Sequence, residues 1–205
     1  MKRLLQKLNG AEMRGLPILV ILVGESGSGK TTFVKMMDCE DNWFESSRAM
    51  AEALAERGEP VTHDTIHAFA NRAYKENPAW QVPNILAALR GKKFLILDGP
   101  RRIGEVRAIL ASHPRVLVIR VAISSKQLRF ERLRERDGID EESFGRLLKD
   151  EAKETELTQI VSLADMTIFN NGSAEETKRR ALELKDILLS IDVVSASDPP
   201  TLTAV

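Results

Sequence analysis

The sequence is short of the features that mark secreted, membrane-spanning and nucleic-acid-binding proteins. Its 205 residues include one cysteine, Cys39, which excludes an intrachain disulfide and is typical of a reducing cytosol. The longest apolar run, Leu16–Val23, is far below the ~20 residues that a bilayer-spanning helix needs. Basic and acidic residues number 30 each, so no excess of positive charge points to a nucleic acid. We therefore expect a cytoplasmic protein with no membrane or nucleic-acid partner.

The two ends of the chain differ in pattern from its body. In residues 1–15, leucines recur at helical spacing among lysines and arginines, which predicts an accessory N-terminal helix. This helix would pack on the domain or on a second subunit, as in a homodimer. A helix lying on a membrane surface is the alternative. Residues 191–205 contain Pro199 and Pro200 and lack periodicity, so we expect a flexible tail. One domain would span residues 16–190.

Short apolar runs rich in isoleucine and valine predict a parallel sheet. They are continuous rather than alternating, as strands buried on both faces are. The four runs are Leu16–Val23, Lys93–Leu97, Val116–Ile123 and Met166–Phe169. Helical patterns lie between them, so strands and helices alternate and the crossovers should be right-handed.

The helical patterns include a long insertion after the first strand and helix. Helices are predicted over residues 30–38, 47–57, 64–76 and 83–90, and residues 41–90 would form a helical insert beside the sheet. Two capping-box patterns, beginning at Ser124 and Ser173, predict the starts of later helices.

Directly after the first apolar run stands the sequence GESGSGKT, which fits the pattern G-x-x-x-x-G-K-[ST]. Its glycines permit backbone angles that turn N–H groups toward an anion. Lys30 would reach the β and γ phosphates of a nucleotide, and the Thr31 hydroxyl would bind Mg²⁺. A glycine-rich turn that matches by chance is the alternative. The predicted ATP-binding residues of this loop are Gly24, Glu25, Ser26, Gly27, Ser28, Gly29, Lys30, Thr31 and Thr32.

The second apolar run ends in the sequence FLILDGPRR, which places Asp98 at a strand end. That is the position of a carboxylate that holds Mg²⁺ beside a bound nucleotide. The alternative is a helix cap or turn residue. The base-reading pattern N-K-x-D and the transporter signature L-S-G-G-Q are both absent, which disfavours a GTPase switch and a transporter ATPase.

Three further stretches of the sequence resemble motifs of two related groups of small-molecule kinases. LDGPRR is similar to the D-G-x-P-R or D-G-x-R element of P-loop nucleoside monophosphate kinases. SSKQLRFERLRERDGIDEESF resembles the lid of dephospho-coenzyme A kinases, and LADMTIFNNGSAEETKRRALEL resembles their last strand and helix. The likeness is greatest to uncharacterised archaeal dephospho-coenzyme A kinase-like proteins. It implies a three-layer P-loop NTPase fold with a parallel sheet of four to five strands, a helical insert and lid helices over residues 124–160.

This resemblance implies an ATP- and Mg²⁺-dependent phosphotransferase. Its catalytic residues would be Lys30, Asp98, Arg101, Arg132 and Arg136, with Thr31 and Asp98 as metal ligands. Helical spacing places Arg129, Arg132 and Arg136 within roughly 60° of arc, a face able to close over a triphosphate. Alternatively, this is a solvated helix in which Glu131 pairs with Arg134 and Glu135 with Arg132. Arg129 would bind ATP, whereas Arg48, Arg72 and Arg101 would bind the acceptor.

The acceptor is the least defined part of this interpretation. A (deoxy)nucleoside monophosphate stands slightly ahead of dephospho-coenzyme A. Related kinases usually have a second strand after the first helix, ending in an acidic residue. Here Ser46 and Ser47 occupy the place where Gly-Asp is common, with Asp38 and Asp41 nearby. This departure favours the alternative of a nucleotide-binding regulatory protein with weak ATPase activity.

The histidines suggest no metal centre. His63 and His67 lie four residues apart, a spacing that can bind zinc, but the H-E-x-x-H glutamate and a third ligand are lacking. We interpret them as an incidental polar pair.

Overall fold

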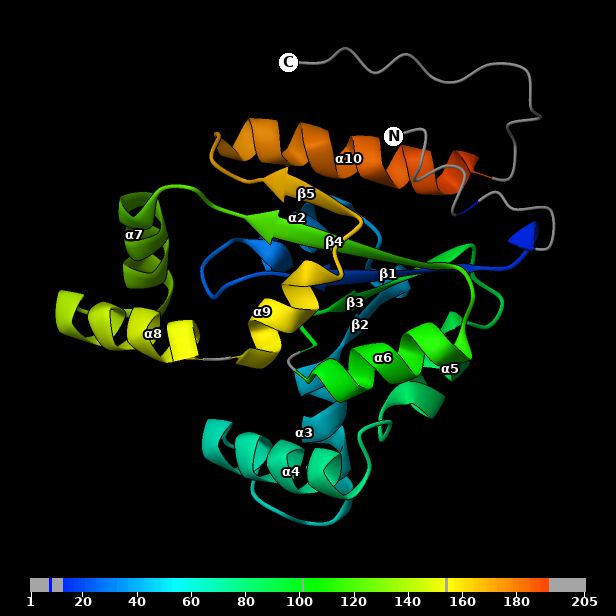
Figure 1. Ribbon diagram of the computed structural model, residues 1–205, viewed down its shortest axis with the longest axis horizontal. Coiled ribbons are helices and arrows are strands. Elements are labelled where there is room, and N and C mark those ends of the chain that lie inside the picture. Colours follow the sequence, from blue (N-terminus) through cyan, green and yellow to red (C-terminus); the bar gives the residue numbers. More distant parts are fainter. Residues whose placement is uncertain (1–7, 9–12, 101, 154, 192–205) are drawn as a thin grey trace.

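The computed structural model describes residues 8, 13–100, 102–153 and 155–191 (Figure 1). Within these ranges a five-stranded parallel sheet has the order β2-β3-β1-β4-β5. The strands are β1 Ile18–Val23, β2 Trp43–Glu45, β3 Phe94–Asp98, β4 Val116–Ala122 and β5 Met166–Phe169. The predicted α/β fold class is thereby confirmed.

Helices cover both faces of the sheet, and further helices lie beyond the carboxyl ends of the strands and beyond the edge strand β2 (Figure 1). On one face lie α2 and α10, and on the other α5, α6 and α9. The helices are α2 Lys30–Met36, α3 Ser46–Glu56, α4 His63–Glu76, α5 Val82–Leu89, α6 Ile103–Ser112, α7 Lys126–Asp137, α8 Glu141–Lys153, α9 Thr155–Ser162 and α10 Ala174–Ser190.

The continuous apolar run of β1 follows from burial on both sides. Ile18, Val20 and Leu22 pack in one core with α2 and α10. The intervening Leu19, Ile21 and Val23 pack in a second core with α5, α6 and α9. Successive side chains of a strand point to opposite faces, so a central strand between two helical layers needs apolar residues throughout.

The sequence pattern had predicted a helical insert over residues 41–90, but this region is not wholly helical. Residues Trp43–Glu45 form β2, which pairs with β3 and sets Glu45 opposite Asp98. Three residues are too few to show a period. Within the same region α5 packs on the sheet, whereas α3 and α4 share a separate apolar cluster around Phe69 and Tyr74.

One of the two predicted helix caps is displaced. The cap of α7 is Ser125, whose Oγ accepts from Leu128 N at 3.1 Å, so the assignment to Ser124 was wrong. Ser124 instead faces Asn171, donating its N–H to Oδ1 at 2.8 Å. Two adjacent serines make either choice compatible with the sequence. The cap of α10 is Ser173, as predicted.

Most of the predicted N-terminal helix and nearly all of the predicted tail lie outside the described residues. Leu8 is described and is fully buried in the core beneath α10. The buried Arg115 donates to its carbonyl oxygen at 2.7 Å. No helix in the described ranges is both long and apolar enough to cross a membrane.

Candidate functional site

The glycine-rich loop lies between β1 and α2, at the carboxyl end of the sheet. Gly24 and Gly29 have φ of 146° and 89°, a region that favours glycine. A Cβ on Gly24 would lie 2.2 Å from the carbonyl oxygen of Val121, and one on Gly29 would lie 2.3 Å from Asn170 Nδ2. Close packing against β4 and the segment after β5 therefore requires glycine at both positions.

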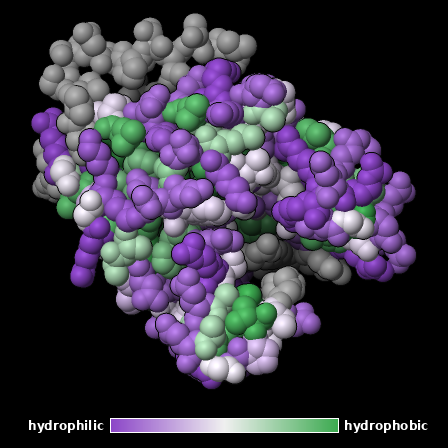
Figure 2. Space-filling model, turned by 180° about the vertical axis from the view of Figure 1, so that it is seen from behind, coloured by the Kyte–Doolittle hydropathy of each residue, from purple (hydrophilic) through white to green (hydrophobic). Residues whose placement is uncertain are grey.

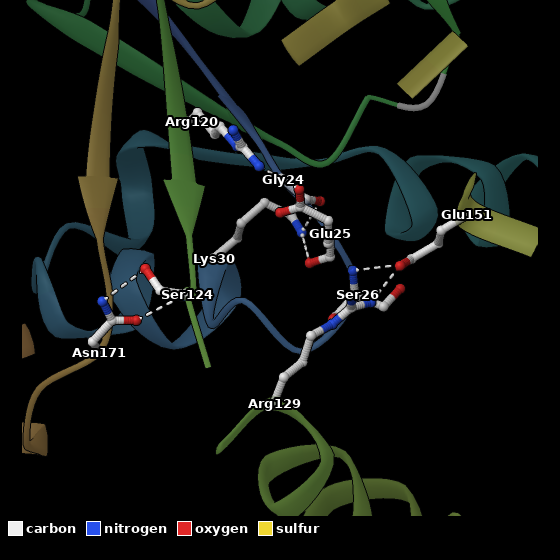
Figure 3. A network of polar contacts seen from close by, with 9 residues as sticks. All are labelled: Gly24, Glu25, Ser26, Lys30, Arg120, Ser124, Arg129, Glu151 and Asn171. Carbon is white, nitrogen blue, oxygen red and sulfur yellow. Dashed lines mark hydrogen bonds and ion pairs between the residues drawn. The ribbon is translucent and has the colours of Figure 1, made fainter. Parts of the chain in front are cut away.

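Lys30 makes hydrogen bonds within the loop, whereas Glu25 joins the loop to β4 (Figure 3). Lys30 Nζ donates to the carbonyl oxygens of Gly24 and Glu25, at 2.8 and 3.2 Å. The Glu25 carboxylate forms an ion pair with Arg120 of β4. The ammonium group thus lies within the curve of the loop, where it can meet an anion held by the loop amides.

Thr31 and Asp98, which the sequence placed 67 residues apart, are in contact. Thr31 Oγ1 donates to Asp98 Oδ2 at 2.9 Å, and Asp98 is only 7% exposed. Both line a cavity of about 630 Å³ together with Lys30, Glu45 and Glu151. Among the described residues no group of three or more His, Cys, Asp and Glu side chains could hold a metal. A metal here would therefore rely on Thr31, Asp98 and the oxygens of a ligand.

The cavity opens between two projecting parts of the molecule, which Figure 2 shows from behind. One side is formed by α3 and α4 and the other by α7, α8 and α9. Arg136 and Ile66 belong to opposite walls of this recess. We call this space, lined by the loop and Asp98, the loop cavity.

Helices α7 and α8, which belong to the predicted lid, contact the loop at Ser26 (Figure 3). Arg129, 7% exposed, donates from Nε to the carbonyl oxygen of Ser26 at 2.6 Å. The Ser26 N–H donates to Glu151 Oε1 at 3.1 Å, and Glu151 also pairs with Arg129. A carboxylate of α8 therefore occupies one backbone donor of the glycine-rich loop. Glu151 was missed from the sequence because 125 residues separate it from Ser26.

The other lid arginines line a second cavity beside the loop, of about 540 Å³. Arg132 is half-buried, which lowers its pKa, and it donates to the carbonyl oxygen of Asn170 at 3.0 Å. Arg136 is exposed and forms an ion pair with Asp137, which raises the Arg136 pKa. Gly27, Gly29 and Thr32 line the same cavity. The structure thus brings the predicted basic face of α7 beside the loop.

Two of the three predicted acceptor arginines, Arg48 and Arg72, do not line the loop cavity. The Arg48 side chain is 77% exposed and pairs with Glu52 one helical turn away. Arg72 is exposed and lies over the Phe69 ring, 5.8 Å from its centroid. Both lie on the solvent side of α3 or α4, which spacing alone did not reveal. Arg101 lies outside the described residues, as do the side chains of His63 and His67.

A buried polar chain links α4, α5 and α6 beneath the recess. The Tyr74 hydroxyl lies 2.8 Å from Glu105 Oε1 and 3.1 Å from Gln81 Oε1. Gln81 Nε2 donates to the carbonyl oxygen of Ser46 at 3.0 Å. Burial raises the pKa of Glu105 from its ordinary 4.5 to about 7, although the bond to Tyr74 opposes this. Burial, and then Glu105 itself, also raise the pKa of Tyr74.

Comparison with known proteins agrees with the fold. No protein-family model matches the chain. It is 28% identical over 185 residues to the UPF0200 protein TK1334 of Thermococcus kodakarensis, covering 84% of this chain and 99% of that protein. A UPF0200 protein of Thermococcus onnurineus is 28% identical over 183 residues, with the same coverage. Shikimate kinase from Aquifex aeolicus superposes with a TM-score of 0.50 at 18% identity, over 84% of this chain and 99% of that one. The chain therefore shares the α/β fold of this shikimate kinase.

The buried Glu105 makes stability depend on pH. Because its pKa is raised in the folded state, the folded protein binds the proton more tightly than the unfolded chain. This contribution is present below about pH 4.5 and is lost as the pH rises through about 7. We expect Glu105→Gln to be more stable than the native protein, because the substitution removes a carboxylate that is unfavourable when charged. The difference in the free energy of unfolding should grow as the pH rises from 5 to 8, to about 3 kcal/mol.

Urea unfolding at pH 5, 6.5 and 8 measures this difference. Glu183→Gln is the matched control, because Glu183 is partly exposed in an ion pair with Arg179 on α10. Equal dependence on pH in the native protein and Glu105→Gln would contradict the assignment.

Proposed function

We propose that this protein is an ATP-dependent phosphotransferase that acts on a nucleotide-like acceptor. The observation that carries the proposal is the GESGSGKT loop with Thr31 in contact with the strand-end carboxylate Asp98. Our first candidate for the acceptor is a (deoxy)nucleoside monophosphate, and dephospho-coenzyme A is the alternative. The likeness of the fold to a kinase supports phosphoryl transfer as the reaction class.

The residues of the loop fit a polyphosphate. Gly24 and Gly29 leave no room for a side chain, so the backbone can approach an anion closely. Lys30 Nζ already lies within the loop, and Arg132 and Arg136 stand beside it. Phosphoryl transfer depends on positive charge around the transferred group more than on covalent help from the protein. These cations are the groups that would stabilise the negative charge of the transferring phosphoryl group.

The donor set also fits Mg²⁺. Thr31 and Asp98 offer hard oxygen atoms, and Glu45 lies opposite Asp98 at the end of the neighbouring strand. Mg²⁺ prefers one or two protein ligands completed by phosphate and water. When bound, the ion would neutralise charge on the β and γ phosphates, while Asp98 and Thr31 would hold it.

A regulatory nucleotide-binding protein with weak ATPase activity is the second candidate. It is favoured by Glu151, which joins the lid to the loop through Ser26 and Arg129. A lid held in this way would bind nucleotide without transferring the phosphoryl group. Acceptor-dependent ADP release separates the two candidates.

The test is a coupled assay of ADP release over nucleoside monophosphates, deoxynucleoside monophosphates and dephospho-coenzyme A. The proposed function requires that at least one acceptor raises ADP release well above the rate with ATP alone. Equal rates with and without every acceptor, together with tight ATP binding, would leave the regulatory role.

We expect Asp98→Asn to lower phosphoryl transfer by roughly a hundredfold or more, because it removes a charged metal ligand. Nucleotide binding in the presence of EDTA should change little, since no metal takes part in it. Fluorescent-nucleotide titration with and without Mg²⁺ measures both effects. Asp186→Asn on the exposed side of α10 is the control. Full transfer activity in Asp98→Asn would refute the metal role.

We expect Glu151→Gln to bind ATP about 3- to 10-fold more tightly than the native protein. The substitution removes a negative charge beside the loop and frees Arg129 from its ion pair. The control is Glu142→Gln on the same helix, in an exposed pair with Arg146. Weaker ATP binding in Glu151→Gln would show that the carboxylate assists the nucleotide instead of competing with it.

A further inference from the structure

A third cavity, of about 250 Å³, extends from the loop cavity between α3, α4 and the start of α6. The two spaces share wall residues, namely Ser46, Ser47, Ile66, Gly99 and Pro100. We call the smaller one the inner cavity. A molecule lying across both would reach from Asp98 to the polar chain around Glu105.

Two buried polar atoms on the wall residues of the inner cavity lack a hydrogen-bond partner in the described protein. They are Ser46 Oγ and Glu105 Oε2. Glu105 is fully buried and Ser46 is 7% exposed. An unpaired buried polar group destabilises a protein, so two of them beside one cavity suit a ligand that supplies the missing partners.

The surrounding hydrogen bonds indicate what Glu105 presents to the cavity. Gln81 Nε2 donates to Ser46 O, so its Oε1 faces the Tyr74 hydroxyl as an acceptor. That hydroxyl has one proton but lies near two acceptor oxygens, on Gln81 and on Glu105. Both contacts are satisfied when Glu105 is protonated and donates from Oε1 to Tyr74. Oε2 is then a carbonyl-type acceptor that needs a donor from the ligand.

The other walls are apolar and favour a flat ring. Met50, Ile66 and Ala70 line them with the Tyr74 ring, which Trp80 meets edge-on at 6.4 Å. Arg102 stands at the rim, but its guanidinium pairs with Glu156. The inner end carries the carboxyl group of Glu105, and the described residues that line the cavity include no cation without an ion-pair partner. An anionic ligand group would therefore be unfavourable there.

We propose that the inner cavity binds an uncharged nitrogen heterocycle of the acceptor, selected by a ring or amino N–H that donates to Glu105, with Ser46 Oγ completing the polar end. This inference rests on the proposed function, because the phosphoryl-accepting end of the same molecule would lie at Asp98. Glu105 and Ser46 are specificity residues in this arrangement. Arg48 and Arg72 do not line the inner cavity. Their absence from its walls agrees with the proposal, because an uncharged ring needs no arginine to bind it.

Matched nucleosides test the selection without requiring catalysis. We would measure binding by calorimetry for adenosine against purine riboside, which lacks the amino group, and for uridine against N3-methyluridine. At least one parent nucleoside should bind tenfold or more tightly than its donor-lacking partner. Shikimate serves as an anionic ring of similar size and should bind more weakly than that nucleoside.

Variants of Glu105 separate hydrogen bonding from packing. Glu105→Gln should keep the discrimination within about threefold, because its amide can present an oxygen where Oε2 lies. Glu105→Leu should abolish it, and Ser46→Ala should weaken binding of the parent nucleoside while leaving the fold intact. Glu183→Gln is the matched surface control. ATP affinity, measured in parallel, should be unchanged in all four variants.

Several outcomes would overturn the inference. Equal binding of each nucleoside pair by the native protein, or discrimination retained in Glu105→Leu, would do so. So would tight ATP binding without binding of any nucleoside, which would leave the proposed function standing. If nucleosides are discriminated but ATP does not bind, the inner cavity is supported and the phosphotransferase proposal fails. Tighter binding of shikimate than of every nucleoside would assign the cavity to an anionic acceptor.

Discussion

The pairing of β3 with β1 is the constraint on which the candidate site depends. Leu22 lies opposite Asp98, and the Gly99 N–H donates to the Leu22 carbonyl oxygen at 3.1 Å. This register ends both strands at the same level, so that Asp98 meets Thr31 at the start of α2. A slip by one residue would turn the Asp98 side chain to the opposite face of the sheet. The apolar residues of both strands, buried in two separate cores, prevent such a slip.

The two ends of the recess differ in their charged groups. At the loop end, the fold gathers Lys30, Arg132 and Arg136 beside glycine amides, as a polyphosphate requires. At the inner end, it buries Glu105 and Tyr74 in a chain of hydrogen bonds, and burial raises the pKa of Glu105 to about 7. The site is thus suited to a molecule with an anionic end and an uncharged end. The Glu151 carboxylate of α8 accepts from the Ser26 N–H of the loop, so an anion bound at that donor would have to displace this contact.

The sequence predicted the parts of the site that local patterns encode. The glycine-rich loop is contiguous, and burial on both faces made the central strands into continuous apolar runs. Asp98 followed from its place at a strand end. The cap of α10 at Ser173 was predicted for a similar reason, since its signal spans four residues.

What the sequence could not predict depends on contacts between distant segments. The three residues of β2 carry no period of their own and are held by pairing with β3. Glu151, Glu105 and Gln81 become site residues only when separate helices meet, so their sequence neighbours give no signal. Arg48 and Arg72 were chosen by residue type, but the rotation of α3 and α4 turns them to solvent. The accessory N-terminal helix, and Arg101 in the acceptor site, stay predictions.

The most direct measurement is calorimetric titration of the purified protein with ATP in the presence of Mg²⁺. Binding of a polyphosphate by the loop is the claim on which the whole account depends. We expect saturable binding at one site per chain, and loss of that binding in Lys30→Ala with the fold retained. The absence of heat for ATP, ADP and GTP at millimolar concentrations would contradict the account.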